Sequence, residues 1–183
     1  MCKLKILNIK RCPGIAVVIF LLVFCILPRS ALTECVEGNC RDGYGVWSTY
    51  EGDKVYRGQF KNGKRWGRGK ITLPDGSKYD GEWKDGKLHG KGTMIYYNGS
   101  QYTGQWEDNQ FNGEGMFTYS NGSIYEGEWQ KGKFHGKGTF TSYDGNRYEG
   151  EWKNGKRHEK SPFIPPDWEE ADGEFNTGVK IGE

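Results

Sequence analysis

Residues 79–101 read YDGEWKDGKLHGKGTMIYYNGSQ, and the start of this stretch recurs every 23 residues along most of the chain. A glycine follows the first tyrosine of each copy after two residues, and a large aromatic residue follows after four. A fixed period of this length is typical of repeat proteins, in which each unit buries its apolar face against its neighbours. The tyrosines that set the period are Tyr56, Tyr79, Tyr102, Tyr125 and Tyr148.

Each copy predicts one β-hairpin. Within 79–84, aromatic or glycine positions alternate with charged ones, which is the period of a strand. Asp85-Gly86 is a strong hairpin-turn signal, and a second strand is predicted from about Lys91 to Tyr97. Successive hairpins then form an all-β fold, an elongated single-layer antiparallel meander with one hairpin per 23-residue repeat. Equivalent turn pairs occur at 62–63, 75–76, 98–99, 121–122, 144–145 and 154–155.

Aromatic residues and glycines share one face of the predicted sheet. We expect the bare glycine backbone to leave room for the flat rings of this face. Gly92, Met94 and Tyr96 of the second strand belong to the same face. The opposite face is acidic on first strands, and cross-strand ion pairs are expected with Arg68, Lys91 and Lys137, which begin second strands.

Composition and charge favour a soluble repeat body. Glycine accounts for 29 of 183 residues and aromatic residues for 15%. Residues 41–158 contain 19 lysines and arginines against 15 acidic residues, whereas 159–183 contain two against seven. A weak positive charge spread over a long body does not form the clustered basic stripe of nucleic-acid-binding proteins, so no nucleic-acid partner is predicted.

The N-terminal residues have the pattern of a targeting segment. Lysines and an arginine precede thirteen apolar residues, Ile15 to Leu27. This run covers about 20 Å as a helix, which is short for a membrane span and typical of a secretory signal. The sequence thus predicts export, with an extracytoplasmic array that is membrane-anchored or secreted (cell envelope or periplasm in a bacterium). Cleavage before Glu34 and an uncleaved anchor both remain open.

Cys35 and Cys40 allow two interpretations. The segment before Cys35 is a loose version of a bacterial lipoprotein signal, with Glu34 in place of a small residue, so lipid would attach to Cys35. Alternatively, the two cysteines form a disulfide in an oxidising compartment. A metal site is not predicted, because no second cluster of cysteine or histidine lies nearby.

The repeated unit Tyr-x-Gly-x-Trp/Phe-x-x-Gly-x-x-x-Gly-x-Gly resembles the MORN repeat (membrane occupation and recognition nexus). The resemblance implies a groove-like single sheet. Together with the leader and the tail, the repeats divide the chain into four segments. Residues 1–34 are predicted as a signal peptide or membrane anchor and 35–55 as an N-terminal cap and half-repeat. Residues 56–158 form the repeat array, and 159–183 form a proline-containing acidic cap or tail, in which Phe163, Ile164 and Trp168 would cover the last sheet edge.

No catalytic function is predicted, and no cofactor. His89, His135 and His158 share one position of the repeat, where Trp66 and Asn112 stand in other copies, so they are predicted as surface residues after a turn. Motifs for a serine nucleophile, a zinc protease or a phosphate loop are absent from the sequence. The chain outside the array is too short for an appended catalytic domain of the kind found in some relatives.

Two binding functions remain. The first is a scaffold for a protein partner, with self-association as one form of it, through the aromatic and glycine face. Its candidates are Tyr79, Trp83, Tyr102, Trp106, Tyr125, Trp129, Tyr148 and Trp152. The second, implied by the resemblance, is binding of anionic membrane lipid by a basic edge beside the first hairpin turns. Its candidates are Lys131, Lys133, Lys153 and Lys156.

Overall fold

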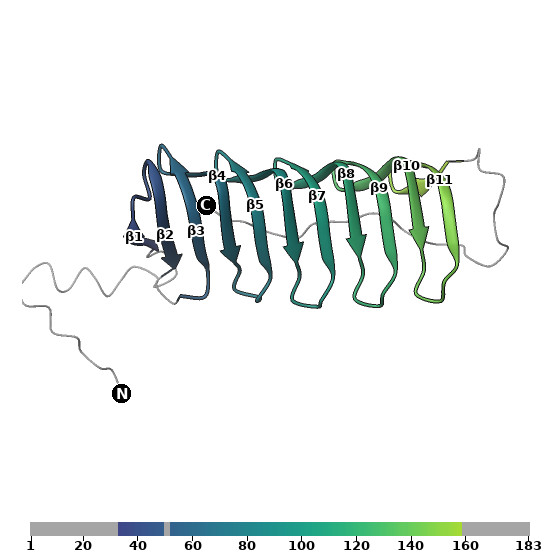
Figure 1. The fold of residues 1–183 in the computed structure, drawn as a ribbon, viewed down its shortest axis with the longest axis horizontal. Helices are drawn as coiled ribbons and strands as arrows, with labels where there is room; N and C mark the ends of the chain where they lie inside the picture. Colours follow the sequence, from purple (N-terminus) through teal and green to yellow (C-terminus); the bar gives the residue numbers. More distant parts are fainter. Residues whose placement is uncertain (1–32, 50–51, 159–183) are drawn as a thin grey trace, which may run out of the picture.

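A computed structural model describes residues 33–49 and 52–158, and these residues form one sheet in a single layer (Figure 1). The sheet has twelve antiparallel strands in the order β1 to β12, so that each strand pairs with its neighbours in the sequence. The predicted all-β meander with one hairpin per repeat is confirmed. Among the described residues, no helix is long and apolar enough to cross a membrane.

The predicted targeting segment and C-terminal cap lie outside the described residues. The strands of the described part are β1 Thr33–Gly38, β2 Gly43–Thr49, β3 Val55–Lys61, β4 Lys64–Thr72, β5 Lys78–Lys84, β6 Lys87–Ile95, β7 Gln101–Glu107, β8 Gln110–Thr118, β9 Ile124–Gln130, β10 Lys133–Thr141, β11 Arg147–Lys153 and β12 Lys156–Arg157.

Two kinds of connection line the two long edges of the sheet. Tight two-residue turns close each hairpin along the upper edge in Figure 1, and longer loops join successive hairpins along the lower edge. The tight turns place their first residue at positive φ, as at Asp85 (51°), and a glycine second. Asn109 takes the place of that glycine in one turn and has φ of 70°, which asparagine tolerates.

The second strand of each hairpin begins earlier than the pattern predicted. The prediction was Lys91 to Tyr97, whereas β6 runs from Lys87 to Ile95. The reason is a bulge at Gly90, which has φ of +59°, so that the register moves from Gly81 opposite Gly92 to Glu82 opposite His89. Gly67, Gly113 and Gly136 adopt the same conformation one period apart.

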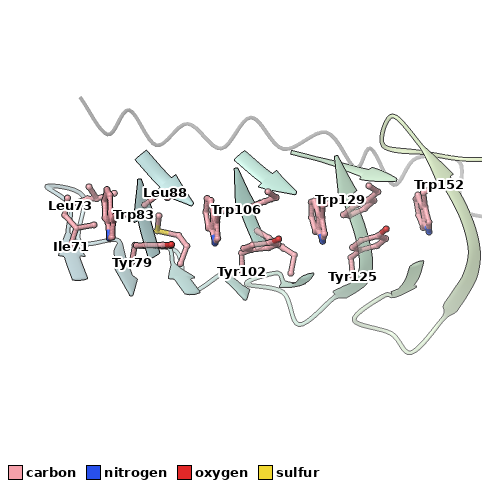
Figure 2. Packing of buried hydrophobic residues seen from close by; sticks show 14 of the residues in the cluster. Ile71, Leu73, Tyr79, Trp83, Leu88, Tyr102, Trp106, Tyr125, Trp129 and Trp152 are labelled. Carbon is pink, nitrogen blue, oxygen red and sulfur yellow. The ribbon is translucent and has the colours of Figure 1, made fainter. Parts of the chain in front are cut away.

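The core consists of the aromatic face, as Figure 2 shows for the middle of the array. Tyr79 lies flat over two glycines of its own hairpin. A Cβ atom on Gly81 would lie 2.4 Å from the hydroxyl of Tyr79, and one on Gly92 would lie 2.2 Å from it. The prediction that glycine makes room for a ring is therefore confirmed, and the ring that fills the space is the tyrosine.

The tryptophans connect one hairpin to the hairpin before it. The Nε1 atom of Trp83 donates a hydrogen bond to the carbonyl oxygen of Gly69 at 3.0 Å, and that of Trp106 donates to Gly92 at 3.2 Å. Each indole also stands edge-on to two tyrosines. The ring centroid of Trp106 lies 5.4 Å from Tyr79 and 5.1 Å from Tyr102, which are favourable T-shaped contacts.

Both long edges carry further bonds between repeats. In the loops, the Ser77 hydroxyl oxygen accepts the Tyr97 amide, and the Ser100 oxygen accepts the Ser120 amide, each at 3.0 Å. At the tight turns, the amide of Gly86 donates to the carbonyl of Arg65 at 2.9 Å. Each repeat is thus held to the previous one at its turn, its centre and its loop.

Candidate interaction surfaces

The eight aromatic residues predicted as an interaction face lie in the core. Each of them, from Tyr79 to Trp152, is at most 3% exposed. Their role as an accessible binding face is therefore wrong, because the bulged second strands bring buried residues such as Leu88 and Phe111 against the same rings. The alternation of residues along each strand placed these aromatic side chains on the correct face, but it could not show which other side chains pack over them.

The tyrosine hydroxyl groups serve this core. Tyr79 and Tyr102 donate hydrogen bonds to the carbonyl oxygens of Glu82 and Gln105, at 2.9 and 2.8 Å. Burial raises the pKa of both phenols well above the ordinary value. They are neutral structural groups at any physiological pH.

The exposed surface of the sheet is its other side, which we call the outer face. Its side chains form three rows across β4 to β11, as the strand register fixes. The middle row is Lys70, Asp80, Thr93, Thr103, Met116, Glu126, Thr139 and Glu149. The turn-side row is Arg68, Glu82, Lys91, Gln105, Glu114, Glu128, Lys137 and Glu151. The loop-side row is Thr72, Lys78, Ile95, Gln101, Thr118, Ile124, Thr141 and Arg147.

Charge on the outer face changes sign along the array. In the three rows, β4 to β6 carry four bases and two acids, and β9 to β11 carry four acids and two bases. Between these halves, Glu114 is the one charged residue that β7 and β8 contribute to the three rows. The exposed apolar side chains Ile95, Met116 and Ile124 lie near the middle of the face. The repeat pattern does not require this polarity, since the inner face is alike in every copy.

Two ion pairs between described residues involve these charges. Lys70 lies 2.7 Å from Asp80, and this hydrogen bond raises the pKa of Lys70. Arg147 lies 2.9 Å from Glu149. Over residues 33–49 and 52–158, Arg68 and Lys91 form no ion pair, so the expected pairs of these bases with first-strand acids are not found.

A hollow of about 890 Å³ opens on the basic half of the outer face. Its rim includes Arg57, Arg68, Lys70, Lys78 and Lys91. Asp80 and Glu114 also line it. The hollow is therefore a broad, mostly basic depression over β3 to β8.

The basic turn edge is interrupted. Lys131, Lys133, Lys153 and Lys156 lie beside the last two tight turns, as predicted, although Lys133 is half-buried. In the middle of the edge, the turn between β7 and β8 carries Glu107 and Asp108 instead. Asp108 forms an ion pair with Lys87 at 3.2 Å, which removes one further positive charge from this edge.

A second cavity, of about 550 Å³, lies at the turn edge near the start of the array. Trp47 and Phe60 form its apolar wall, and Arg65 lies beside them. The Arg65 guanidinium stacks 4.6 Å from the Trp83 ring centroid and donates to the Gly86 carbonyl at 2.9 Å. Burial lowers the pKa of Arg65 to about 10, so it stays charged at neutral pH.

Cys35 and Cys40 are joined by a disulfide, with their Cα atoms 5.8 Å apart. The bridge connects β1 to the residues before β2. Lipidation of Cys35 uses the same sulfur atom, so the two predicted fates of this cysteine exclude each other.

The histidines form no metal site. Among the described residues, no three side chains of histidine, cysteine, aspartate or glutamate are grouped as metal ligands. The Nδ1 atoms of His89 and His135 are buried without a hydrogen-bond partner in the described part. These rings lie opposite Glu82 and Glu128 at the bulge of their own hairpins.

The fold defines a β-hairpin repeat protein built as one extended sheet. Comparison with known families identifies the kind of repeat. The MORN repeat model matches residues 56–78, 79–101, 102–124, 125–147 and 148–160. The chain belongs to the MORN repeat family. Proteins of this family are generally non-catalytic, and their repeats are generally interaction modules for proteins or membrane lipids.

Other comparisons add little. No curated protein matches the chain. One similar solved structure is the SAS-4 (dCPAP) TCP domain of Drosophila melanogaster in complex with a proline-rich motif of Ana2 (dSTIL), with 11% identity and a TM-score of 0.37. The match covers 61% of this chain and 61% of that one, and the score is too low to indicate a shared fold.

Proposed function

We propose that this chain is an exported, membrane-associated scaffold without catalytic activity, which binds a protein partner through its outer face. The observation that supports this most strongly is the division of the molecule into two faces. The aromatic residues are buried in the core, whereas the outer face presents exposed charges and exposed apolar residues over eight strands. Among the described residues, Arg68 and Lys91 of this face form no ion pair. Exposed charges of both signs, placed on a rigid frame, favour a partner of complementary charge.

Export rests on the sequence of the N-terminal segment. Intact mass and membrane fractionation of the protein from its native host test it. Loss of the leader, or acylation at Cys35, would support export. An unprocessed chain in the cytosol would refute it.

A photo-crosslinking residue tests the binding face. Placed at Thr103, in the centre of the outer face, it should give protein adducts in the native host. The same residue at Asn98, in a loop between repeats, is the matched control and should give none. Absence of adducts at Thr103, with the chain folded, would refute the outer face as the binding surface.

Binding of anionic lipid by the turn edge is the second candidate. It is favoured by the straight line of the tight turns in Figure 1, which lets the basic turns meet one flat surface. Reversal of charge at Lys131, Lys133, Lys153 and Lys156 should then abolish salt-dependent binding to anionic liposomes. Unchanged binding by the reversed protein would remove this candidate.

A further inference from the structure

The outer face is complementary to itself, and we propose that two copies of this chain stack outer face to outer face as a symmetric dimer. This inference rests on the proposed function and names the partner of the same surface. A dimer of this kind has a two-fold axis, and both copies use the same residues. The axis we infer runs parallel to the strands and passes midway between β7 and β8.

This axis sets each strand of one copy against a defined strand of the other. Strand β4 faces β11 of the second copy, β5 faces β10, β6 faces β9 and β7 faces β8. A rotation about an axis parallel to the strands leaves the position of a residue along the strand direction unchanged. The turn-side row of one copy therefore faces the turn-side row of the other, and the same holds for the middle and loop-side rows.

Opposite charges then meet in the turn-side row and in the middle row. Arg68 faces Glu151 and Lys70 faces Glu149 of the second copy. Closer to the axis, Glu82 faces Lys137 and Lys91 faces Glu128. Each pair occurs twice by symmetry, and no like charges face each other within the three rows.

Apolar side chains meet near the axis. Ile95 is 45% exposed and Ile124 is 37% exposed, although both sit on a strand of the sheet. In the proposed register, Ile95 of one copy faces Ile124 of the other, and Thr103 faces Met116. Stacking would remove these side chains from water.

The neighbouring register shows that this match is specific. If the axis passed through β7 instead, β4 would face β10 and β5 would face β9. Arg68 would then meet Lys137, Asp80 would meet Glu126, and Glu82 would meet Glu128. A displacement of the axis by half a strand spacing thus creates three like-charged contacts, each repeated by symmetry, and leaves Lys91 facing Glu114 as the one opposite-charged pair in the three rows.

The dimensions suit a stable dimer. Eight strands about 4.8 Å apart and about five residues of each strand give roughly 650 Å² per copy, so the total of roughly 1,300 Å² lies in the range of specific interfaces. The strands keep nearly the same direction from β2 to β11 in Figure 1, so two sheets can remain aligned along the array. Sheets with so little twist are typically stabilised by stacking.

Photo-crosslinking of the full chain tests the register. A benzophenone amino acid in place of Ile95 should give a dimer on irradiation. After cleavage at glutamate, the crosslink should lie in peptide 115–126 of the second copy, which contains Ile124 and is separate from the peptide that contains position 95. The same amino acid in place of Tyr97, exposed on a loop, is the matched control and should give no dimer.

Charge exchange tests the pairing. Arg68→Glu and Glu151→Arg should each reduce the dimer yield about tenfold, since each turns two attractive pairs into repulsive ones, and the double variant should restore it. Arg57→Glu is the matched reversal on β3, which faces only the two-residue strand β12. Lys156 and Arg157 of that strand lie at the turn end and not at the height of Arg57, so this variant should leave the yield unchanged.

Three results would overturn the dimer. These are a monomer at all concentrations, a crosslink in any other peptide of a second copy, and a crosslink to residues 159–183 of the same chain. An adduct between Ile95 and a different protein would also overturn the dimer, while leaving the outer-face scaffold intact. Absence of any adduct here and at Thr103 would remove both proposals.

Discussion

The two faces of this sheet are made by the same strands and follow opposite rules. On the inner face, Tyr79, Tyr102 and Tyr125 repeat the same contacts in successive hairpins. On the outer face, equivalent positions differ from repeat to repeat, as Asp80, Thr103 and Glu126 do. The comparison teaches that regularity marks the residues that hold the fold, whereas departure from regularity marks the residues free to specify a partner.

The largest difference between the faces should appear at alkaline pH. Burial raises the pKa of Tyr56, Tyr79, Tyr102 and Tyr125 above the ordinary value near 10. Their contribution to stability is fully present below pH 10 and falls above it, because the unfolded chain releases protons that the folded chain keeps. The loss is about 1.4 kcal/mol per pH unit for each tyrosine, or about 6 kcal/mol for these four at pH 11.

Urea unfolding from pH 8 to pH 11, followed by tryptophan fluorescence, measures this loss. Burial also raises the pKa of Tyr96 and Tyr119, so Tyr102→Phe should remove about a sixth of the pH dependence that the tyrosines cause. If the variant keeps the full dependence, the inner-face phenols are not its source.

A side chain at Gly92 should be the most damaging single change on the inner face. Gly92→Val places atoms where the Tyr79 ring lies, so the ring must move out of the core. We expect a loss of about 3 kcal/mol or more in the free energy of unfolding. Thr93→Val, the adjacent outer-face position, is the control, and similar losses for both variants would contradict the division of the faces.

The loop bonds between repeats should have a smaller effect. Ser100→Ala removes the oxygen that accepts the Ser120 amide, and an unpaired amide costs about 1 kcal/mol. Chemical denaturation compares it with Ser120→Ala, where the hydroxyl is exposed. Equal stability of the two variants would show that the loops do not hold the repeats together.

Substitutions on the outer face should hardly change the free energy of unfolding. Glu126→Gln and Arg68→Glu change exposed charges that form no ion pair in the described part of the chain, so each should alter the free energy of unfolding by no more than about 0.5 kcal/mol. Thermal unfolding at low protein concentration measures this without a contribution from association. A loss above 1.5 kcal/mol would mean that the outer face also holds the fold.

The sequence predicted the meander, the hairpin turns and the assignment of faces, because each follows from a period of two within strands and 23 between them. It missed the bulge at Gly90. In the motif Gly-Lys-Gly at 90–92, the first glycine is needed for its positive φ and the second for the space under the Tyr79 ring, and the sequence does not distinguish these two roles. It also misjudged Trp83 as an exposed candidate, because the bond to Gly69 joins two repeats and has no local signal. The polarity of the outer face is visible only after the register has placed residues of different strands side by side.

The single-file order of strands has a mechanical consequence. The first and last strands lie at opposite ends of the array, so a pull on the two ends acts across the strands and loads the hydrogen bonds of the sheet one junction after another (Figure 1). Such a molecule unfolds under force by separation of one strand after another from the end of the sheet. Each released repeat of 23 residues adds roughly 70 Å to the length, so a force–extension record should contain evenly spaced steps, as a series of identical links would give.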